Sequence, residues 1–148
     1  MNIGIDIGST ASKVVVYDKD KDEILYKILM PSGWNSKETS GEIYKNLVEN
    51  GFDVDNSYVV ATGYGRVSVP YADRVVTEIT THSKGAIYLL KRDCDVIDIG
   101  GQDTKIINIS NGMVSDFIMN DKCSAGTGKF LEVMSNRLGV TLDEMFEL

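Results

Sequence analysis

One eight-residue pattern occurs twice in this chain and constrains its fold more than any other feature. The first copy runs from Asp6 to Lys13 with the sequence DIGSTASK, and the second runs from Asp98 to Lys105 with the sequence DIGGQDTK. Each copy begins with Asp-Ile-Gly, carries a hydroxyl residue just before its lysine, and lies between two apolar stretches that are typical of strands. The sequence therefore predicts two equivalent β-hairpins, 92 positions apart.

The residues of the two predicted hairpins suit the phosphates of a nucleotide. Glycine together with serine or threonine at a turn exposes backbone N–H groups, which can bind a phosphate. An aspartate at the end of the first strand can hold Mg²⁺ through water, because Mg²⁺ gives up its hydration shell reluctantly. The candidate Mg²⁺ residues are Asp6 and Asp98, and the candidate phosphate contacts are Gly8, Ser9, Thr10, Gly100 and Gly101.

Two ordinary glycine turns are the alternative interpretation, since an aspartate can simply cap its own turn. The matched spacing of the two copies makes that interpretation the weaker one. Lys13 could reach a phosphate or be a solvated strand residue, and the same choice holds for Lys105. Gln102 and Asp103 follow the second turn directly and could contact the nucleotide or orient a water molecule.

Composition limits the class of protein. The 148 residues are 43% hydrophobic and 25% charged, which is ordinary for a globular domain. The net charge of −7 argues against nucleic acid or an anionic membrane as the main partner. No apolar run approaches the ~20 residues of a membrane span, and no signal peptide is expected. Two cysteines in such a chain favour the reducing cytoplasm.

The pattern of apolar residues predicts an α/β protein with a partly repeated order of elements. The order is three strands, a helix, two short strands and a helix, followed by three strands and a helix. The predicted strands are 3–8, 12–18, 23–30, 59–62, 75–77, 94–99, 103–109 and 113–119, and the predicted helices are 38–50, 79–91 and 126–138, with a last turn capped by Thr141.

The two copies differ in length. We expect a first lobe over residues 1–92 and the first part of a second lobe over residues 93–148. A duplicated fold needs two halves of similar size, so the second copy is expected to be incomplete and the chain to be truncated at its C-terminal end. Leu142, Met145 and Phe146 are then expected to form an apolar surface without a partner.

Five segments together resemble a known family. They are Gly4–Thr10, Ala61–Arg66, Thr77–Thr80, Asp98–Asp103 and Met119–Phe130, in this order along nearly the whole chain. The paired Asp-Ile-Gly hairpins are similar to those of the actin, sugar kinase and Hsp70 ATPase superfamily. More closely, the chain resembles the ATP-dependent activators of 2-hydroxyacyl-CoA dehydratases, in the BadF/BadG/BcrA/BcrD ATPase family. The resemblance implies a ribonuclease H-like, actin-like ATPase fold, a duplicated βββαβα unit whose second copy is incomplete here.

The resemblance also implies an activity and its partners. Family members are oxygen-sensitive homodimers with one [4Fe-4S] cluster between the subunits. Hydrolysis of ATP to ADP, with Mg²⁺, drives a low-potential electron into a partner dehydratase, and the electron comes from a donor such as ferredoxin or flavodoxin. Each subunit supplies two cysteines to the cluster. Cys123 matches the first of them, and the second lies beyond Leu148 in the family.

Two further residues take candidate roles from this resemblance. In the related ATPase fold an acidic or amide residue just before a helix positions the attacking water, which assigns a catalytic role to Glu78 alongside Asp98. Alternatively, Glu78 only offsets the dipole of its helix. Cys123 precedes a stretch of small residues that opens a helix, where a negative thiolate or cluster is favoured. On spacing alone Cys123 is an ordinary thiol, and the resemblance favours the cluster role.

Other functions stay open at this point. A non-redox small-molecule or sugar kinase of the same fold would need an acceptor pocket with an aspartate base, and no segment provides one convincingly. A nucleotide-binding filament protein would leave the cysteine segment unexplained. Gly126–Gly128 could form a third phosphate loop at a helix start, although it does not match a Walker A motif. His82 is interpreted as a surface residue and Cys94 as a core residue.

Overall fold

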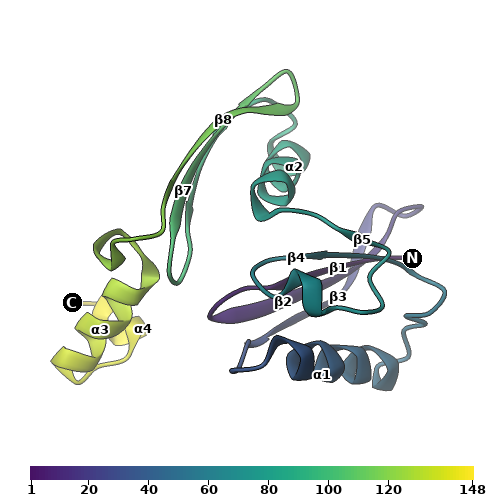
Figure 1. Cartoon of the computed structure of the whole chain (residues 1–148), viewed down its shortest axis with the longest axis horizontal. Coiled ribbons are helices and arrows are strands. Elements are labelled where there is room, and N and C mark those ends of the chain that lie inside the picture. Colours follow the sequence, from purple (N-terminus) through teal and green to yellow (C-terminus); the bar gives the residue numbers. More distant parts are fainter. The chain divides into compact units, whose positions relative to one another are not determined.

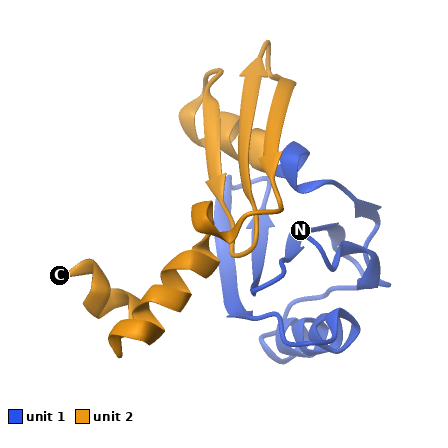
Figure 2. Ribbon diagram, turned by 60° about the vertical axis from the view of Figure 1, so that its left-hand side comes forward, with its two compact units in different colours: residues 1–81 blue, residues 82–148 orange.

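The computed structural model describes residues 1–148, which form two compact units. The first unit is Met1–Thr81 and the second is His82–Leu148, coloured blue and orange in Figure 2. The units divide within helix α2 (Glu78–Leu90). The lobe boundary expected between residues 92 and 93 remains a prediction.

The first unit is built on a five-stranded mixed sheet with the strand order β3-β2-β1-β4-β5 (Figure 1). Strand β1 pairs antiparallel with β2 and parallel with β4. The first three strands thus form a meander, and β4 returns beside β1 after a helix. The strands are β1 (Asn2–Ile7), β2 (Ala11–Asp18), β3 (Glu23–Pro31), β4 (Tyr58–Thr62) and β5 (Arg74–Val75).

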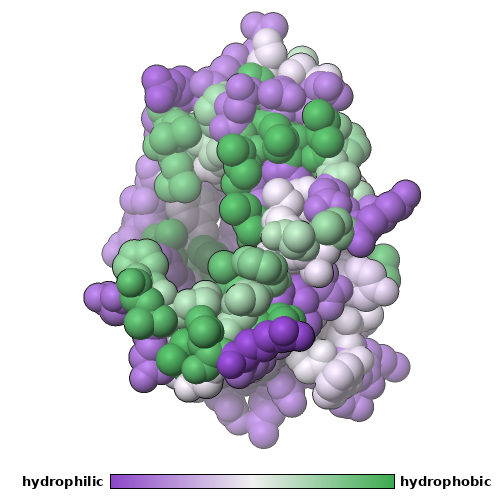
Figure 3. Space-filling view, turned by 90° about the vertical axis from the view of Figure 1, so that its left-hand side faces the viewer, coloured by the Kyte–Doolittle hydropathy of each residue, from purple (hydrophilic) through white to green (hydrophobic).

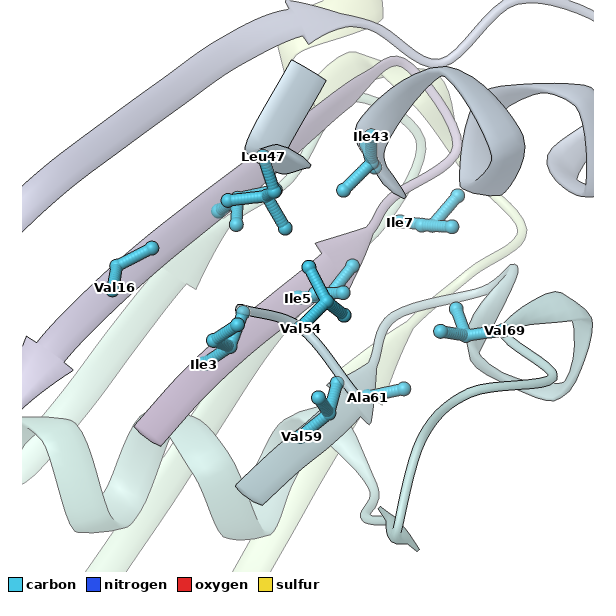
Figure 4. Close-up of a cluster of buried hydrophobic side chains, with 11 residues drawn as sticks. Ile3, Ile5, Ile7, Val16, Ile43, Leu47, Val54, Val59, Ala61 and Val69 are labelled. Atoms are coloured by element: carbon cyan, nitrogen blue, oxygen red, sulfur yellow. The ribbon is translucent and has the colours of Figure 1, made fainter. Parts of the chain in front are cut away.

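Helix α1 (Ser36–Glu49) covers one face of this sheet and closes the main core. Its Ile43 and Leu47 side chains lie among the sheet residues in Figure 4 and are fully buried. Alternate residues of β1 and β2 point to the same face, as the two-residue period of a strand requires. Each fully buried large aliphatic side chain contributes roughly 1.5–3 kcal/mol relative to an exposed one. The core residues on the strands are Ile3, Ile5, Ile7, Val14, Val16, Val59 and Ala61.

The second unit has a three-stranded antiparallel sheet with the order β6-β7-β8. A short 3₁₀ helix follows the last strand and leads into two helices. No counterpart of β4 and β5 follows them within residues 1–148. The elements are β6 (Asp95–Ile99), β7 (Thr104–Ser110), β8 (Met113–Asn120), η2 (Ser124–Gly126), α3 (Gly128–Leu138) and α4 (Leu142–Phe146).

The predicted order of elements is confirmed, with two informative differences. The strand expected over residues 75–77 ends at Val75, because the Thr77 hydroxyl bonds to that of Thr80 at 3.0 Å and the chain turns into α2. The helix expected from residue 126 begins at Gly128, because residues 124–126 form the 3₁₀ helix η2. The cap predicted at Thr141 is a complete capping box with Glu144.

Many large apolar side chains are exposed, and green hydrophobic groups reach the surface between purple hydrophilic ones in Figure 3. In the second unit they include Ile97, Ile99 and Ile118 on the sheet. Leu142 and Phe146 are exposed as expected, whereas Met145 is half-buried. None of the helices has both the length and the apolar character needed to cross a membrane.

Candidate functional site

The first repeated segment is a tight hairpin between β1 and β2. Asp6 and Lys13 lie opposite each other across the two strands, and Gly8 N–H donates to the Ala11 carbonyl at 3.2 Å. The two residues at the tip are Ser9 and Thr10, whose backbone N–H groups donate to no protein group. The tip therefore offers two neighbouring donors to an anion.

The second repeated segment has the same geometry. Asp98 and Lys105 are cross-strand partners of β6 and β7, and Gly100 N–H donates to the Asp103 carbonyl at 2.8 Å. Gly101 and Gln102 form the tip, and their N–H groups likewise have no protein acceptor. The prediction of two equivalent hairpins is thus confirmed down to the residue register.

The glycine that opens each turn is required by the close approach of the chain behind it. A Cβ at Gly8 would lie 2.8 Å from the Ala11 carbonyl oxygen, and a Cβ at Gly100 would lie 2.5 Å from a carboxylate oxygen of Asp103. Contacts under 3.0 Å force something to shift. The two glycines therefore keep the turns tight enough for the tip amides to converge.

Asp6 has one satisfied and one unsatisfied carboxylate oxygen. Its Oδ2 accepts from Lys13 Nζ at 3.1 Å, while its Oδ1 is buried and has no hydrogen-bond partner. Gly63, after β4, has φ +86°, and a Cβ there would lie 2.3 Å from that Oδ1. A buried carboxylate oxygen without a donor is costly, so it is a fitting position for a hydrated cation.

Asp98 has two basic neighbours instead. His82 Nδ1 lies 2.9 Å from its Oδ2, and Lys105 Nζ lies 3.6 Å from the same oxygen. His82 Nδ1 is buried and makes no hydrogen bond, although it lies this close to the carboxylate. Lys105 also donates to Asp103 at 2.7 Å. His82, Lys105 and the two carboxylates thus form one charged cluster.

This cluster answers two questions that the sequence left open. Lys13 is half-exposed, with 52% of its side-chain surface accessible, whereas the figure for Lys105 is 3%. Only the first lysine is a solvated strand residue. The interpretation of His82 as a plain surface residue is wrong, since its ring is two-thirds buried against Asp98. The signal available for Lys105 was its place in β7, where it shares a face with Ile107 and Ile109, which are both buried.

Glu78 is the first residue of α2. Both interpretations of Glu78 place it at the start of a helix. Its backbone carbonyl accepts from the Thr81 hydroxyl at 2.9 Å. Thr81 Oγ1 also lies 3.2 Å from that of Thr62 at the end of β4. The start of α2 is thereby tied to the sheet of the first unit.

Cys123 lies between β8 and η2, and its side chain is exposed. Neither it nor Cys94 forms a disulfide. No group of three or more histidine, cysteine, aspartate or glutamate side chains is arranged to hold a metal ion. One exposed thiol can supply a single ligand to a cluster. The donor set fits Mg²⁺ at Asp6 better than iron and sulfur at Cys123 alone.

The start of α3 does not act as a third phosphate loop. Gly128 N–H donates to the Gly100 carbonyl and Lys129 N–H donates to the Gly101 carbonyl, both at 2.9 Å. Thr127 N–H and Phe130 N–H also have backbone acceptors. The amides that a phosphate would need are therefore already bonded.

Comparisons with known proteins agree with this geometry. A sequence profile of the BadF/BadG/BcrA/BcrD ATPase family matches residues 3–148. The activator of lactoyl-CoA dehydratase from Anaerotignum propionicum is 43% identical over 148 residues, which are 99% of this chain and 57% of that protein. The chain thus spans little more than half the length of this relative.

Two solved structures match nearly the whole chain. One is component A of (R)-2-hydroxyglutaryl-CoA dehydratase from Acidaminococcus fermentans, with a TM-score of 0.87 at 41% identity over 99% of this chain and 57% of that one. The other is the activator of 2-hydroxyisocaproyl-CoA dehydratase from Clostridium difficile with bound ADPNP, with a TM-score of 0.86 at 38% identity over 97% of this chain and 54% of that one. These matches confirm the predicted actin-like ATPase fold, and the chain belongs to the BadF/BadG/BcrA/BcrD ATPase family.

Proposed function

We propose that this chain is the nucleotide-binding part of an ATP-hydrolysing activator of a 2-hydroxyacyl-CoA dehydratase. The observation that carries the proposal is the pair of identical turns, each with two unbonded N–H groups beside an aspartate–lysine pair. The similarity to the dehydratase activators supports the choice of reaction. Binding of ADPNP by the Clostridium difficile activator supports the choice of ligand.

The proposed roles follow from the chemistry of each group. Asp6 would hold a hydrated Mg²⁺ through its unbonded Oδ1, and Asp98 would do so from the second hairpin. The tip amides of Ser9, Thr10, Gly101 and Gln102 would bind phosphate oxygens, with Gly8 and Gly100 keeping the turns tight. Lys13 and Asp103 border these tips and would contact the nucleotide or its water shell.

Hydrolysis needs little covalent work from the protein. Glu78 would orient the attacking water, while the N–H groups and Mg²⁺ neutralise the charge that develops on the phosphates. Cys123 would be one thiolate ligand of a [4Fe-4S] cluster shared in a homodimer, which supplies a low-potential electron when bound. The partners in this proposal are a dehydratase and a ferredoxin- or flavodoxin-type donor, in the cytoplasm.

Calorimetric titration with Mg-ADP and Mg-ATP tests the nucleotide site. Asp98→Asn removes the charge that faces Mg²⁺ and is expected to abolish measurable binding. Asp20→Asn changes an exposed aspartate in the β2–β3 turn by the same atoms and is expected to bind as the unchanged chain does. Equal affinity of the Asp98→Asn chain and the unchanged chain would contradict the site.

Iron content tests the role of Cys123 separately. In the full-length protein purified without oxygen, Cys123→Ala is expected to lose its iron, because a cluster ligand is removed. Cys94→Ala is the matched control, since Cys94 lies just before β6 and has no assigned ligand role. A full iron complement in Cys123→Ala would remove the thiol from the proposal without affecting the nucleotide site.

A further inference from the structure

The second phosphate turn is bonded directly to the helix that follows the Cys123 segment. The Gly100 and Gly101 carbonyls accept from the first two amides of α3, Gly128 and Lys129, both at 2.9 Å. A Cβ at Gly128 would lie 3.3 Å from the Gly100 oxygen and 3.4 Å from the Gly101 Cα. Glycine at the helix start therefore permits this close approach. Thr127 caps α3 without a side-chain bond, so the turn supplies the acceptors that a cap would supply.

Peptide geometry connects these bonds to the tip amides. All peptide bonds of the chain are trans, so the C=O and N–H of one peptide point in opposite directions. Because the Gly100 and Gly101 carbonyls point at α3, the N–H groups of Gly101 and Gln102 point away from it. A phosphate accepting from these two N–H groups would polarise the same two peptides and strengthen their bonds to α3.

A second bond joins the same hairpin to the end of η2. The Thr104 hydroxyl donates to the Gly126 carbonyl, and Thr104 is the first residue of β7 after the turn. Thr104 is also the cross-strand partner of Asn120, the last residue of β8. The phosphate turn, the end of β8 and the end of η2 are therefore bonded within one small region.

Asn120 holds the backbone of Cys123 on both sides. Its side-chain amide donates to the Cys123 carbonyl at 2.9 Å, and its side-chain oxygen accepts from Cys123 N–H at 3.2 Å. The same oxygen lies 3.4 Å from the N–H of Lys122. An exposed segment fixed by three bonds to one asparagine has a defined backbone position while its thiol remains accessible.

We propose that Thr104 and Asn120 are positioning residues that join the second phosphate turn to the Cys123 segment, so that the two move as one body. The turn carbonyls accept from the start of α3, and the Thr104 hydroxyl donates to the end of η2. Thr104 pairs with Asn120 in the sheet, and Asn120 bonds to the backbone of Cys123. Occupation of the turn by phosphate then changes the affinity of Cys123 for its ligand, and that ligand changes the affinity of the turn for phosphate by the same factor. This last consequence rests on the proposed nucleotide site, whereas the linkage itself does not.

Amide hydrogen exchange at Cys123 measures the linkage, because its N–H donates to Asn120 and exchanges only when this bond opens, whereas its exposed thiol is accessible throughout. Thr104→Val removes the hydroxyl that bonds to Gly126 and has no contact with Cys123. It is expected to raise the exchange rate of the Cys123 amide about fivefold, the factor that corresponds to one lost hydrogen bond. Thr104→Ser keeps the hydroxyl and is expected to restore the original rate. The Ile109 amide, which donates to the Cys94 carbonyl, is the internal reference and is expected to exchange at an unchanged rate.

Asn120→Ala provides the second variant. It is expected to raise the exchange rate of the Cys123 amide at least as much as Thr104→Val and to speed exchange of the Gly100 amide, which donates to Asp103 in the turn. Asn136→Ala, on the exposed face of α3, is the matched control and is expected to change neither. Unchanged exchange of the Cys123 amide in Thr104→Val, or a rise in Asn120→Ala without faster exchange of the Gly100 amide, would overturn the proposal. If one of the two variants loses its fold, which equally fast exchange throughout β6 and β7 reveals, the other variant carries the comparison.

Nucleotide provides the last arm of the experiment. Saturating Mg-ADP is expected to slow exchange of the Cys123 amide in the unchanged chain and to leave it unaffected in Thr104→Val. Equal slowing in both would overturn the linkage. If titration shows that Mg-ADP does not bind, the proposed nucleotide site fails, while the comparison without nucleotide still decides whether Thr104 and Asn120 join the two segments.

Discussion

The two hairpins share their sequence pattern and their register, but the helices that follow them are capped differently. In the first unit, Asn35 caps α1 with its own side chain, which accepts from Lys37 N–H at 3.1 Å. In the second unit, α3 has no side-chain cap, and its first amides donate to the phosphate turn instead. The first hairpin reaches its helix only through the loop, because the Thr10 carbonyl accepts from Ser32 N–H at 3.1 Å and the Ser32 carbonyl accepts from the Thr39 hydroxyl of α1. In the second unit, two backbone hydrogen bonds therefore join the turn directly to the first residues of α3.

The matching faces of the two sheets also differ in how far their side chains are buried. Ile5, Ile7 and Val14 are buried under α1 in the first unit, with no more than 1% of their surface exposed. The residues at the matching positions of the second repeat are Ile97, Ile99 and Ile106, which are 69%, 63% and 40% exposed. The repeated pattern therefore determines the hairpin, whereas burial depends on whether a helix lies over it.

Truncating matched isoleucines gives the largest expected difference. Ile5→Ala removes a fully buried side chain and leaves a cavity, which is expected to lower the free energy of unfolding by about 3–4 kcal/mol. Ile97→Ala, at the matching position of the second unit, is expected to cost less than about 1 kcal/mol because its side chain is mostly exposed. Urea unfolding followed by circular dichroism measures both. Similar costs would mean that the Ile97 face is covered in solution.

Replacing the matched lysines tests the charged cluster. Lys105→Met leaves the Asp98 and Asp103 carboxylates without their buried cation and is expected to cost about 2–3 kcal/mol, since both partners are mostly buried. Lys13→Met removes a half-exposed partner of Asp6 and is expected to cost less than about 1 kcal/mol. The same unfolding measurement compares them. A Lys13 effect as large as that of Lys105 would contradict the difference in burial.

Replacing Gly8 and Gly100 by alanine compares a clash with backbone atoms in the first turn with a clash with a side chain in the second. In Gly8→Ala the new Cβ meets the carbonyl oxygen of Ala11, so the turn itself must move, and a cost of about 1–2 kcal/mol is expected. In Gly100→Ala the first obstacle is the Asp103 carboxylate, which can rotate away, so about 0.5–1 kcal/mol is expected. Crystal structures of the variants would show a displaced turn in the first and a displaced side chain in the second. A displaced backbone in Gly100→Ala would reverse this assignment.

Sequence reasoning predicted the hairpins well because their signals are local. A tight turn with Gly8 or Gly100 at its start places residues on either side of it in register, so the pairing of Asp6 with Lys13 follows directly from the spacing. The order of strands and helices was also readable, since each strand alternates and each helix has an apolar stripe. The observed ends of some elements differ from the predicted ends by one or two residues. At Thr77, for example, the side chain bonds to Thr80 in the first turn of α2.

The charged cluster and the Cys123 linkage could not be read in the same way. His82 and Asp98 are 16 positions apart on a helix and a strand, and no periodic pattern records that their side chains meet. The bonds of Asn120 to Cys123 and of Thr104 to Gly126 join side chains to backbone atoms, so the partner's residue type carries no signal. These contacts depend on the folded path of the chain.

The smallest expected effect tests the helix that caps itself most completely, α4. Hydrogen bonds from the Thr141 backbone and hydroxyl to the Glu144 carboxylate hold the pKa of that carboxyl below its ordinary value of 4.5. Because the pKa is lowered in the folded chain, the cap stabilises α4 above the ordinary value and loses its effect as the pH falls through the folded value. A side-chain NMR titration of Glu144 is expected to give a midpoint below 4.5, with the Thr141 amide signal shifting at the same pH. Thr141→Val removes the hydroxyl donor while keeping the backbone donor, and is expected to return the midpoint only part of the way. A midpoint unchanged by Thr141→Val would mean that the hydrogen bond from the Thr141 backbone amide alone lowers the pKa of the Glu144 carboxyl.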